Sequence, residues 1–440
     1  MNTAIFLCSQ GCHRQVVAAR KKEPLLALAR CLPEVIRRPL RRLRNWYANR
    51  AAMQSPVSVP IGRLLLGDEG GIPAAKYAQM IGNPLRPSTP ASESPHTKLL
   101  LSFLEHGDGL FDPNVFAGTP YYQNALQAIE ILGHYFDATH EKQIVDVARR
   151  FVECHRNDNA NASQSYSGLT PTGPPIQARP IAFSDCYQIT DGHHRVASAI
   201  AKGLTSVRVV SVGPAVTTPL QSLLLDVLWT QGRRELYQPI VSPELGPDWR
   251  LVRRCTDRFD LISRFLGDHG FLSTGRQTYL DIGSSYGWFL SRMKDLGFHA
   301  AGIEPDPAAV LVGVLVYGLD QGQISVADAP RYLTKIDRQY DVVSCFSVMH
   351  HFATGRQHVA AEEFIRRIDR VTGRMLLFET GQNHEEWFKN THPQWDAAYI
   401  QRWLRENTTF THIIPLGVDS DAVPPFERNY GRTIFACLRD

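Results

Sequence analysis

Two stretches of the sequence carry residues whose types and spacing could do chemistry. The first is ITDGHHRVASAIAKGLTSVRVVSV (residues 189–212), where an Asp-Gly turn precedes two histidines and an arginine. A helix that begins at such a turn offers free N–H groups to an anion, and an arginine can add a bidentate contact. Histidine can donate hydrogen bonds or transfer a proton. We therefore predict a phosphate- or nucleotide-binding site at Asp191, Gly192, His193, His194 and Arg195, with the two histidines as candidates for phosphate chemistry. The alternative is a capped turn with no chemical role.

The second stretch is YLDIGSSYGWFLSRM (279–293), an apolar segment that ends in an acid and a glycine-rich turn. The glycines let the backbone approach a ligand closely, and the helix that follows exposes N–H groups at its start. After about twenty residues, HAAGIEPD ends a second predicted strand in Glu304, placed to accept hydrogen bonds from both hydroxyls of a ribose. This order of strand, glycine loop, helix, strand and acid predicts a pocket for a nucleoside cofactor.

The details of the glycine loop distinguish between cofactors. A dinucleotide site needs G-x-G-x-x-G to hold a pyrophosphate, whereas the run here is Asp281-Ile-Gly-Ser-Ser-Tyr-Gly. An acid at the strand end opposes phosphate and favours the cationic amino-acid part of S-adenosylmethionine (SAM). The stretch resembles motif I of class I SAM-dependent methyltransferases, over about residues 270–440. Ser285 stands where many members have the middle glycine.

That resemblance implies SAM as the cofactor and assigns roles to individual positions. Asp328 and Ala329, in ISVADAPRYL, would meet the adenine amino group, and YDVVSCFSVMHHF (340–352) resembles the fourth-strand motif. The implied cofactor-binding residues are Asp281, Gly283, Ser284, Ser285, Gly287, Glu304, Pro305, Asp328, Ala329 and Phe346. His350, His351 and Glu379 are candidates for the base that removes a proton from a methyl acceptor. The alternatives are that the histidines serve structure and that methyl transfer needs only proximity and alignment.

The first stretch also resembles a known group. Together with VSVPIGRLLL (57–66) as an opening strand, it is similar to the ParB/sulfiredoxin-like superfamily, loosely over residues 55–215. Members include DNA-partition proteins that bind CTP, sulfiredoxin and a free-serine kinase. The resemblance implies ATP or CTP with Mg²⁺ as a ligand and leaves phosphoryl transfer open. His193 occupies the position of the reactive cysteine of sulfiredoxin, and no helix-turn-helix follows residue 215, so we expect neither redox chemistry nor DNA partition.

These sites must be positioned by more than one domain, because 440 residues exceed a single ordinary core. We predict a basic N-terminal arm (1–54), a ParB/sulfiredoxin-like domain (55–215), a helical connector (216–272) and a methyltransferase domain (273–440). The expected fold class is α/β: a C-terminal Rossmann-like domain with a seven-stranded sheet, preceded by a smaller α+β domain with a helical insertion. Helical spacing of apolar residues places that insertion between residues 97 and 156.

The hydrophobic pattern and the cysteines bear on membrane insertion, cell compartment and zinc binding. The sequence lacks the roughly 18 to 20 consecutive apolar residues of a membrane span. Eight scattered cysteines are typical of reduced thiols, so we expect a cytoplasmic protein. Cys8, Cys12 and His13 have no second ligand pair at zinc-finger spacing, and we expect no metal site there.

The basic character of the chain is concentrated at its start. The formal net charge is +4, yet residues 1–50 hold nine Arg and two Lys against two Glu, so the remainder is net acidic. Residues 35–50 interleave arginines with apolar and aromatic residues, which suits peripheral contact with the inner face of an anionic membrane. A solvated arm is an equal alternative, and nucleic acid is a less favoured partner that composition does not exclude.

The leading hypothesis is a SAM-dependent methyltransferase with an N-terminal nucleotide- or phosphate-binding module. Its acceptor would be a small molecule or a glycan, and in a bolder version the first domain phosphorylates what the second methylates. The alternative is a nucleotide-gated, ParB-type protein associated with DNA or a membrane, whose methyltransferase fold only senses SAM. The segment TGQNHEEWFKNTHPQW (380–395) either holds a sugar or packs against the sheet.

Overall fold

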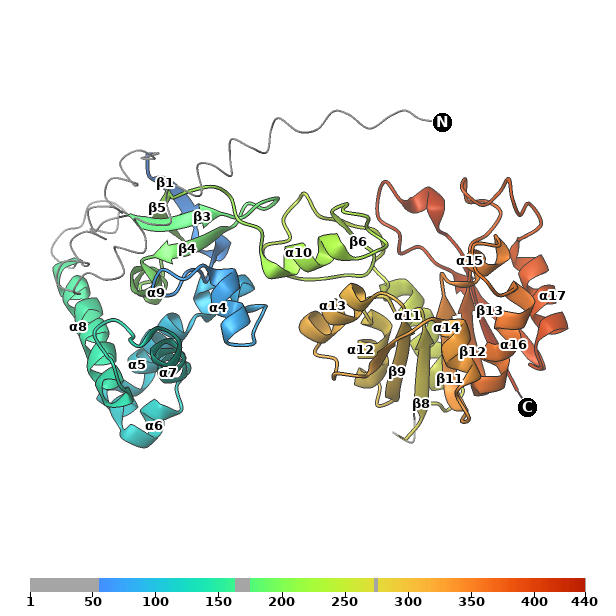
Figure 1. The fold of residues 1–440 in the computed structure, drawn as a ribbon, viewed down its shortest axis with the longest axis horizontal. Helices are drawn as coiled ribbons and strands as arrows, with labels where there is room; N and C mark the ends of the chain where they lie inside the picture. The colour runs from blue at the N-terminus through green and yellow to red at the C-terminus, as the bar shows by residue number, and fades with distance from the viewer. Residues whose placement is uncertain (1–54, 163–174, 273–275, 440) are drawn as a thin grey trace, which may run out of the picture.

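The computed structural model describes residues 55–162, 175–272 and 276–439. The expectations for the basic arm, namely the membrane contact of residues 35–50 and the absence of a metal site at Cys8, Cys12 and His13, lie outside the described residues. Figure 1 shows an N-terminal unit and a C-terminal unit joined by a connector that contains α10 and β6. Within these ranges, no helix is long and apolar enough to cross a membrane.

The N-terminal unit is built on a mixed five-stranded sheet in the order β1-β5-β3-β4-β2. Its strands are β1 (Val57–Pro60), β2 (Leu64–Leu65), β3 (Ile176–Pro180), β4 (Tyr187–Asp191) and β5 (Ser206–Ser211). Helix α9 (His193–Ala201) joins β4 to β5 and packs its apolar face on the sheet through Val196 and Ala199. The helix predicted to begin at the Asp-Gly turn is confirmed. Residues 181–186 separate β3 from β4, and Phe183 takes a positive φ there.

The predicted helical insertion is confirmed and forms an apolar cluster of its own. It comprises α5 (Pro95–His106), α6 (Pro113–Ala117), α7 (Pro120–Leu132) and α8 (Ile144–Ala162), and α4 (Ala74–Met80) precedes it. The side chains of Ser94 and Thr119 cap α5 and α7, and each helix begins with a proline. Capping fixes where these helices start, because it satisfies backbone N–H groups that have no partner inside the helix.

The connector is less helical than predicted. Helix α10 (Pro219–Asp226) is followed by irregular chain and by the short parallel pair β6 (Glu235–Leu236) and β7 (Arg250–Leu251). Pro239, Pro243 and Pro247 prevent a continuous helix there, since proline removes a backbone donor and clashes with the preceding turn. Helix α11 (Thr256–Asp268) packs into the apolar core of the C-terminal sheet, so it belongs to that domain rather than to the connector.

The C-terminal unit is the predicted seven-stranded α/β domain, with the order β10-β9-β8-β11-β12-β14-β13. The strands are β8 (Thr278–Ile282), β9 (His299–Glu304), β10 (Ile324–Val326), β11 (Tyr340–Phe346), β12 (Thr372–Glu379), β13 (His412–Val418) and β14 (Thr433–Leu438). Strand β14 runs antiparallel to both of its neighbours, whereas the other pairs are parallel. The helices are α12 (Trp288–Asp295), α13 (Pro307–Tyr317), α14 (Ala329–Thr334), α15 (Met349–Ala353), α16 (Ala361–Val371) and α17 (Ala397–Asn407). Two apolar clusters hold these helices against the buried strands.

Candidate functional site

The strand order places the predicted cofactor residues together. Strand β8 lies between β9 and β11, where the order of the parallel strands reverses, and Asp281 pairs in register with Gly302 on one side and Ser344 on the other. Ligands of open α/β sheets bind at the carboxyl ends of the strands at such a reversal. Asp281 and Glu304 therefore lie at the same edge of the sheet, as the spacing of the motif predicted.

The loop after β8 has positive φ angles at its two glycines, the residue type that adopts them most easily. Gly283 and Gly287 have φ values of 76° and 80°, and a Cβ at these positions would lie 2.4 Å from a Val348 methyl carbon and 2.6 Å from a Leu319 methyl carbon. Ser285 also takes a positive φ, of 52°, although it is not a glycine. The departure from the usual glycine pattern thus keeps the backbone shape. Ser284 is buried and fixes the loop by donating its hydroxyl to the carbonyl of Asp281 at 3.0 Å.

The Asp281 side chain is buried near the carboxyl end of β8. Its carboxylate accepts a 2.5 Å hydrogen bond from the Ser344 hydroxyl, which also lies 2.6 Å from the Tyr279 hydroxyl. Burial raises the pKa of Asp281 to about 6, against the lowering effects of that hydrogen bond and of Arg258. The sequence analysis missed Ser344, and only the pairing of β11 with β8 reveals it.

Glu304 ends β9 and is held by backbone donors. Its two oxygens accept hydrogen bonds from the N–H of Ser285 at 2.8 Å and of Asp306 at 3.1 Å. Burial raises the pKa of Glu304 to about 7, despite these two hydrogen bonds. A carboxylate oxygen has two acceptor positions, so Glu304 keeps the capacity to accept hydrogen bonds from a ligand. Pro305, beside it, is exposed.

The other predicted cofactor residues lie at the ends of β10 and β11. Asp328 caps α14, which begins at Ala329, by accepting the N–H of Arg331 at 3.1 Å, and this role accounts for an acid there without any ligand. Phe346 is buried, with its ring centroid 5.0 Å from that of Phe289. Contact of these residues with a cofactor stays a prediction.

The two histidines of α15 differ in their surroundings. His350 is 6% exposed, and its Nδ1 accepts the N–H of Gly381 at 3.3 Å, which leaves the ring proton on Nε2. Burial, and then the charge of Arg432, hold the pKa of His350 well below its usual range. His351 is only partly buried, and its pKa is lowered by burial and by Arg356. The geometry therefore favours His351 over His350 as a proton acceptor.

Glu379 lies in an ion network, and this environment argues against the predicted role as a base. It is fully buried, and its oxygens lie 2.7 Å from Arg432, 3.5 Å from Arg253 and 3.4 Å from Arg258. Burial opposes ionisation, yet these guanidiniums hold the pKa of Glu379 far below its ordinary value. A carboxylate held ionised in this way is a poor proton acceptor, and we reassign it as an anchor of the β12 end.

The segment 380–395 divides between packing and exposure. Phe388 and Trp395 are buried in the core, as the packing alternative predicted. Trp387 is 36% exposed, with its ring centroid 5.0 Å from that of His350. Its Nε1 donates to Glu385 at 2.9 Å, and Glu385 in turn accepts two hydrogen bonds from Arg432. One aromatic ring thus stays accessible and fixed in orientation beside the histidines of α15.

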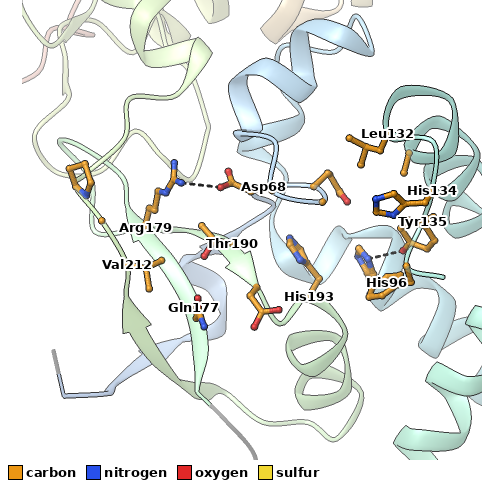
Figure 2. A pocket seen from close by; sticks show the side chains of 18 residues that line it. Asp68, His96, Leu132, His134, Tyr135, Gln177, Arg179, Thr190, His193 and Val212 are labelled. Atoms are coloured by element: carbon orange, nitrogen blue, oxygen red, sulfur yellow. Dashed lines mark hydrogen bonds and ion pairs between the residues drawn. The ribbon is translucent and has the colours of Figure 1, made fainter. Parts of the chain in front are cut away.

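A second site lies in the N-terminal unit, as a cavity of about 980 Å³ between the sheet and the helical insertion. Figure 2 shows Arg179 and Gln177 on the sheet side, His96 and Tyr135 on the insertion side, and His193 between them at the start of α9. Three polar atoms among the lining residues are buried and find no partner in the described part of the chain: His193 Nε2, His96 Nδ1 and Thr190 Oγ1. Buried polar groups are normally hydrogen-bonded, so these atoms indicate a place for a polar ligand or for water.

The Asp-Gly-His-His-Arg motif does not act as one unit. His193 lines the cavity together with Asp191. His194 instead packs in the helical insertion, with its ring centroid 3.9 Å from that of Phe151 and its Nε2 3.1 Å from the Tyr121 hydroxyl. Burial lowers the pKa of His194 to about 3, so it is neutral. The predicted role of His194 in phosphate chemistry is therefore corrected to a packing role.

Arg195 is also engaged elsewhere. It donates to the Asp191 carboxylate at 2.7 Å and to the carbonyl of Pro175 at 3.3 Å, and it is not among the residues that line the cavity. Gly192 permits this arrangement with a φ of 105°, because a Cβ there would lie 3.0 Å from the Arg195 guanidinium. A bidentate contact from Arg195 to a ligand would require this pair with Asp191 to open.

The cavity contains charged residues that the sequence analysis missed. Asp68 pairs with Arg179 at 3.2 Å and accepts the N–H of Ala74, and burial raises its pKa. Glu69 is hydrogen-bonded to Arg86. The two acids follow Gly67, where a Cβ would lie 1.4 Å from the Ile189 carbonyl oxygen. In the sequence, the signal that could have found them is the run LLLGDEGG (64–71), in which two acids directly follow an apolar segment and a glycine.

Comparisons with known proteins bear on the C-terminal unit. Residues 250–413 match the family model described as a methyltransferase domain. A structure of the bifunctional kinase-methyltransferase WbdD is 17% identical, with a TM-score of 0.40, and the match covers 50% of this chain and 46% of that one. Magnesium protoporphyrin IX methyltransferase (ChlM) from Synechocystis PCC 6803 with bound SAH is 18% identical, with a TM-score of 0.33, over 42% of this chain and 82% of that one. The match thus spans less than half the length of WbdD.

Comparison of the sequence with curated proteins finds no match. The family match covers β8 to β12 and the first two residues of β13, whereas β14 lies beyond it. It includes the glycine loop, Asp281, Glu304 and the histidines of α15. The C-terminal unit of this chain thus contains a region that matches a methyltransferase domain, and it is built on a Rossmann-like seven-stranded sheet.

Proposed function

We propose that this protein transfers the methyl group of SAM to a small-molecule or glycan acceptor, and that its N-terminal unit binds a nucleotide or a phosphorylated ligand. The observation that carries the first part is the arrangement of Asp281, the positive-φ glycine loop and Glu304 at the sheet edge where the strand order reverses. SAM supplies an electrophilic methyl group when bound. The residues of the chain bind and orient it there, with Asp281 near the cationic methionine end and Glu304 at the ribose.

The acceptor would lie near α15. His351 is the better placed of the two histidines to take a proton from an acceptor hydroxyl, because the Nδ1 of His350 already accepts a hydrogen bond. The exposed ring of Trp387 offers an apolar face of the kind on which sugar rings or aromatic groups stack. His351 and Trp387 together support an acceptor that has a hydroxyl next to a flat apolar face.

The N-terminal cavity supports the second part of the proposal. The His193, His96 and Thr190 atoms without a partner in the described residues leave room for a polar ligand or water, and α9 begins at the cavity. Asp68, Glu69 and Asp191 supply carboxylate oxygens, the ligands that Mg²⁺ prefers. No cluster of three metal-binding side chains occurs within the described ranges, but a nucleotide-bound Mg²⁺ needs only one or two carboxylates plus phosphates. The residues therefore fit a Mg²⁺–nucleotide, and phosphoryl transfer to a hydroxyl is the second candidate activity.

Titration calorimetry with SAM and with SAH tests the first part. We expect wild-type protein to bind both, and the double variant Asp281→Asn, Glu304→Gln to lose at least tenfold in affinity, since each acid contributes about 1 kcal/mol or more. Asp260→Asn, on the exposed side of α11, is the matched control and should bind normally. Absence of SAM binding to the wild type would overturn the proposal.

The second part is tested by titrating ATP and CTP with Mg²⁺, followed by an assay for release of nucleoside diphosphate. We expect binding that His193→Ala removes and that the exposed-surface control His140→Ala leaves unchanged. If neither nucleotide binds, the nucleotide module is refuted. If the full-length protein binds duplex DNA in a salt-sensitive manner and shows no methyl transfer, the binding-protein alternative replaces the enzyme proposal.

A further inference from the structure

Gln238, in the connector, contacts the cofactor loop of the methyltransferase domain directly. Its side-chain nitrogen donates to the carbonyl of Ser284 at 3.2 Å, and its side-chain oxygen accepts the N–H of Trp288 at 3.1 Å. The side chain is 4% exposed, so both hydrogen bonds form away from water. The glycine loop thus receives two contacts from a residue about fifty positions before it in the sequence.

The two contacts hold the loop at both ends. Ser284 is the first residue after Gly283, and Trp288 is the first residue of α12, whose N–H has no partner inside the helix. Between them lies Ser285, whose N–H binds Glu304. The primary amide of Gln238 donates to the carbonyl with its nitrogen and accepts from the N–H with its oxygen, so one terminal group makes both contacts. A carboxylate would repel the Ser284 carbonyl. An apolar side chain would remove the partner of the Trp288 N–H and leave the Ser284 carbonyl with the Gly287 N–H as its donor.

A second connector contact reaches the Glu304 side of the site. The N–H of Leu228 donates to the Asp306 carboxylate at 2.7 Å, and the N–H of Asp306 donates to Glu304 at 3.1 Å. Apolar packing supports the same junction, because Leu220 and Leu224 of α10 lie in one cluster with Ala309 and Val312 of α13. The connector therefore covers the outer side of the loop and of the segment after β9.

The other end of the connector is fixed to the N-terminal unit. Glu244, fully buried, accepts hydrogen bonds from Ser88 and from Thr218. Gln221 donates to the carbonyl of Ala182 at 2.7 Å and to that of Glu244 at 3.0 Å. Gln221 and Gln238 are thus two buried connector glutamines, one engaged with the N-terminal unit and the other with the cofactor loop.

We propose that Gln238 is a positioning residue for SAM: by clamping Ser284 and Trp288 from outside the domain, it holds the glycine loop in its binding conformation. This inference rests on the SAM site proposed above. A loop that already has its bound conformation loses less conformational entropy when SAM binds. Loss of the two Gln238 hydrogen bonds should therefore change the affinity for SAM more than the rate of methyl transfer.

The test compares Gln238→Met with Gln221→Met in the full-length protein. Methionine keeps the volume of glutamine and removes both hydrogen bonds. We expect Gln238→Met to raise the Kd and KM for SAM about tenfold, with kcat at saturating SAM changed less than twofold. Gln221→Met should leave the Kd for SAM unchanged even if it lowers the melting temperature. Gln238→Glu, which keeps only the acceptor, should bind SAM no better than Gln238→Met.

Each outcome decides the matter. If the wild type binds SAM and Gln238→Met binds it equally well, or if Gln221→Met weakens SAM to the same extent, Gln238 is not a positioning residue. If the wild type does not bind SAM, the proposed function itself fails. Should Gln238→Met not fold, Gln238→Asn keeps the amide but is one methylene too short. In Gln238→Asn, hydrogen exchange of the backbone N–H groups of residues 284–288 should be faster than in the wild type. An unchanged exchange rate would also overturn the proposal.

Discussion

The affinity for SAM should depend on pH through Glu304. Burial raises the pKa of this carboxyl to about 7. In the proposed SAM site the ribose hydroxyls would donate to its ionised form. The carboxylate is therefore fully available above pH 7 and is lost as the pH falls through that value. If only the ionised form binds, the apparent Kd rises about twofold at pH 7 and about tenfold at pH 6, relative to pH 8. Asp281, with a pKa of about 6, should steepen the loss below pH 6.

Titration calorimetry from pH 5.5 to 8.5, at constant ionic strength, measures this dependence. The Glu304→Gln variant has no titrating group at this position, so its Kd should be higher at pH 8 and nearly flat between pH 6.5 and 8. SAH keeps the ribose and should show the same slope as SAM with the wild type. The reasoning is refuted if the wild-type Kd is constant between pH 6 and 8, or if Glu304→Gln retains the slope.

Three further substitutions test the structural assignments. His194→Ala should lower the free energy of unfolding by about 2–4 kcal/mol, because its ring stacks on Phe151 and Phe136, whereas His193→Ala should cost less, because its ring stacks more loosely, on His96. Chemical denaturation distinguishes them, and equal losses would contradict the different roles. Glu379→Gln should cost about 3–5 kcal/mol, since it leaves the surrounding arginines facing one another, and a loss under about 1 kcal/mol would argue against the ion network. Gly67→Ala should destabilise the N-terminal sheet by about 3 kcal/mol or more, because its Cβ meets a backbone oxygen that cannot move aside. Limited proteolysis should then detect opening of that sheet, and an unchanged SAM affinity is the internal control.

Much of the C-terminal domain was predictable, because its signals are local. A buried strand, a glycine loop, a helix and a terminal acid follow one another within residues 278–304, and each is set by short-range backbone preferences. The seven strands were confirmed for the same reason. The error in the connector arose where Pro239, Pro243 and Pro247 should have outweighed an overall polar, helix-like composition.

The N-terminal motif was harder to interpret, because neighbours in sequence diverge in space. Consecutive residues of a helix point about 100° apart, and here His193 lines the cavity whereas His194 packs against Phe151. The sequence could place this turn before a helix. It could not indicate that the helical insertion would surround His194 with Phe151 and Tyr121, or that His96 would stand beside His193.

The sequence by itself determined the type and order of the elements, the acid and glycines of the cofactor loop, and the turn that starts α9. These depend on backbone conformation within a few residues, which local composition controls. Only the tertiary structure decided which side chains face a ligand. Glu379 became part of an ion network because Arg253 and Arg432, distant in sequence, pack beside it, and Gln238 became a clamp because the connector folds back onto α12. Such contacts join segments that no spacing rule relates, so they appear only when the chain is folded.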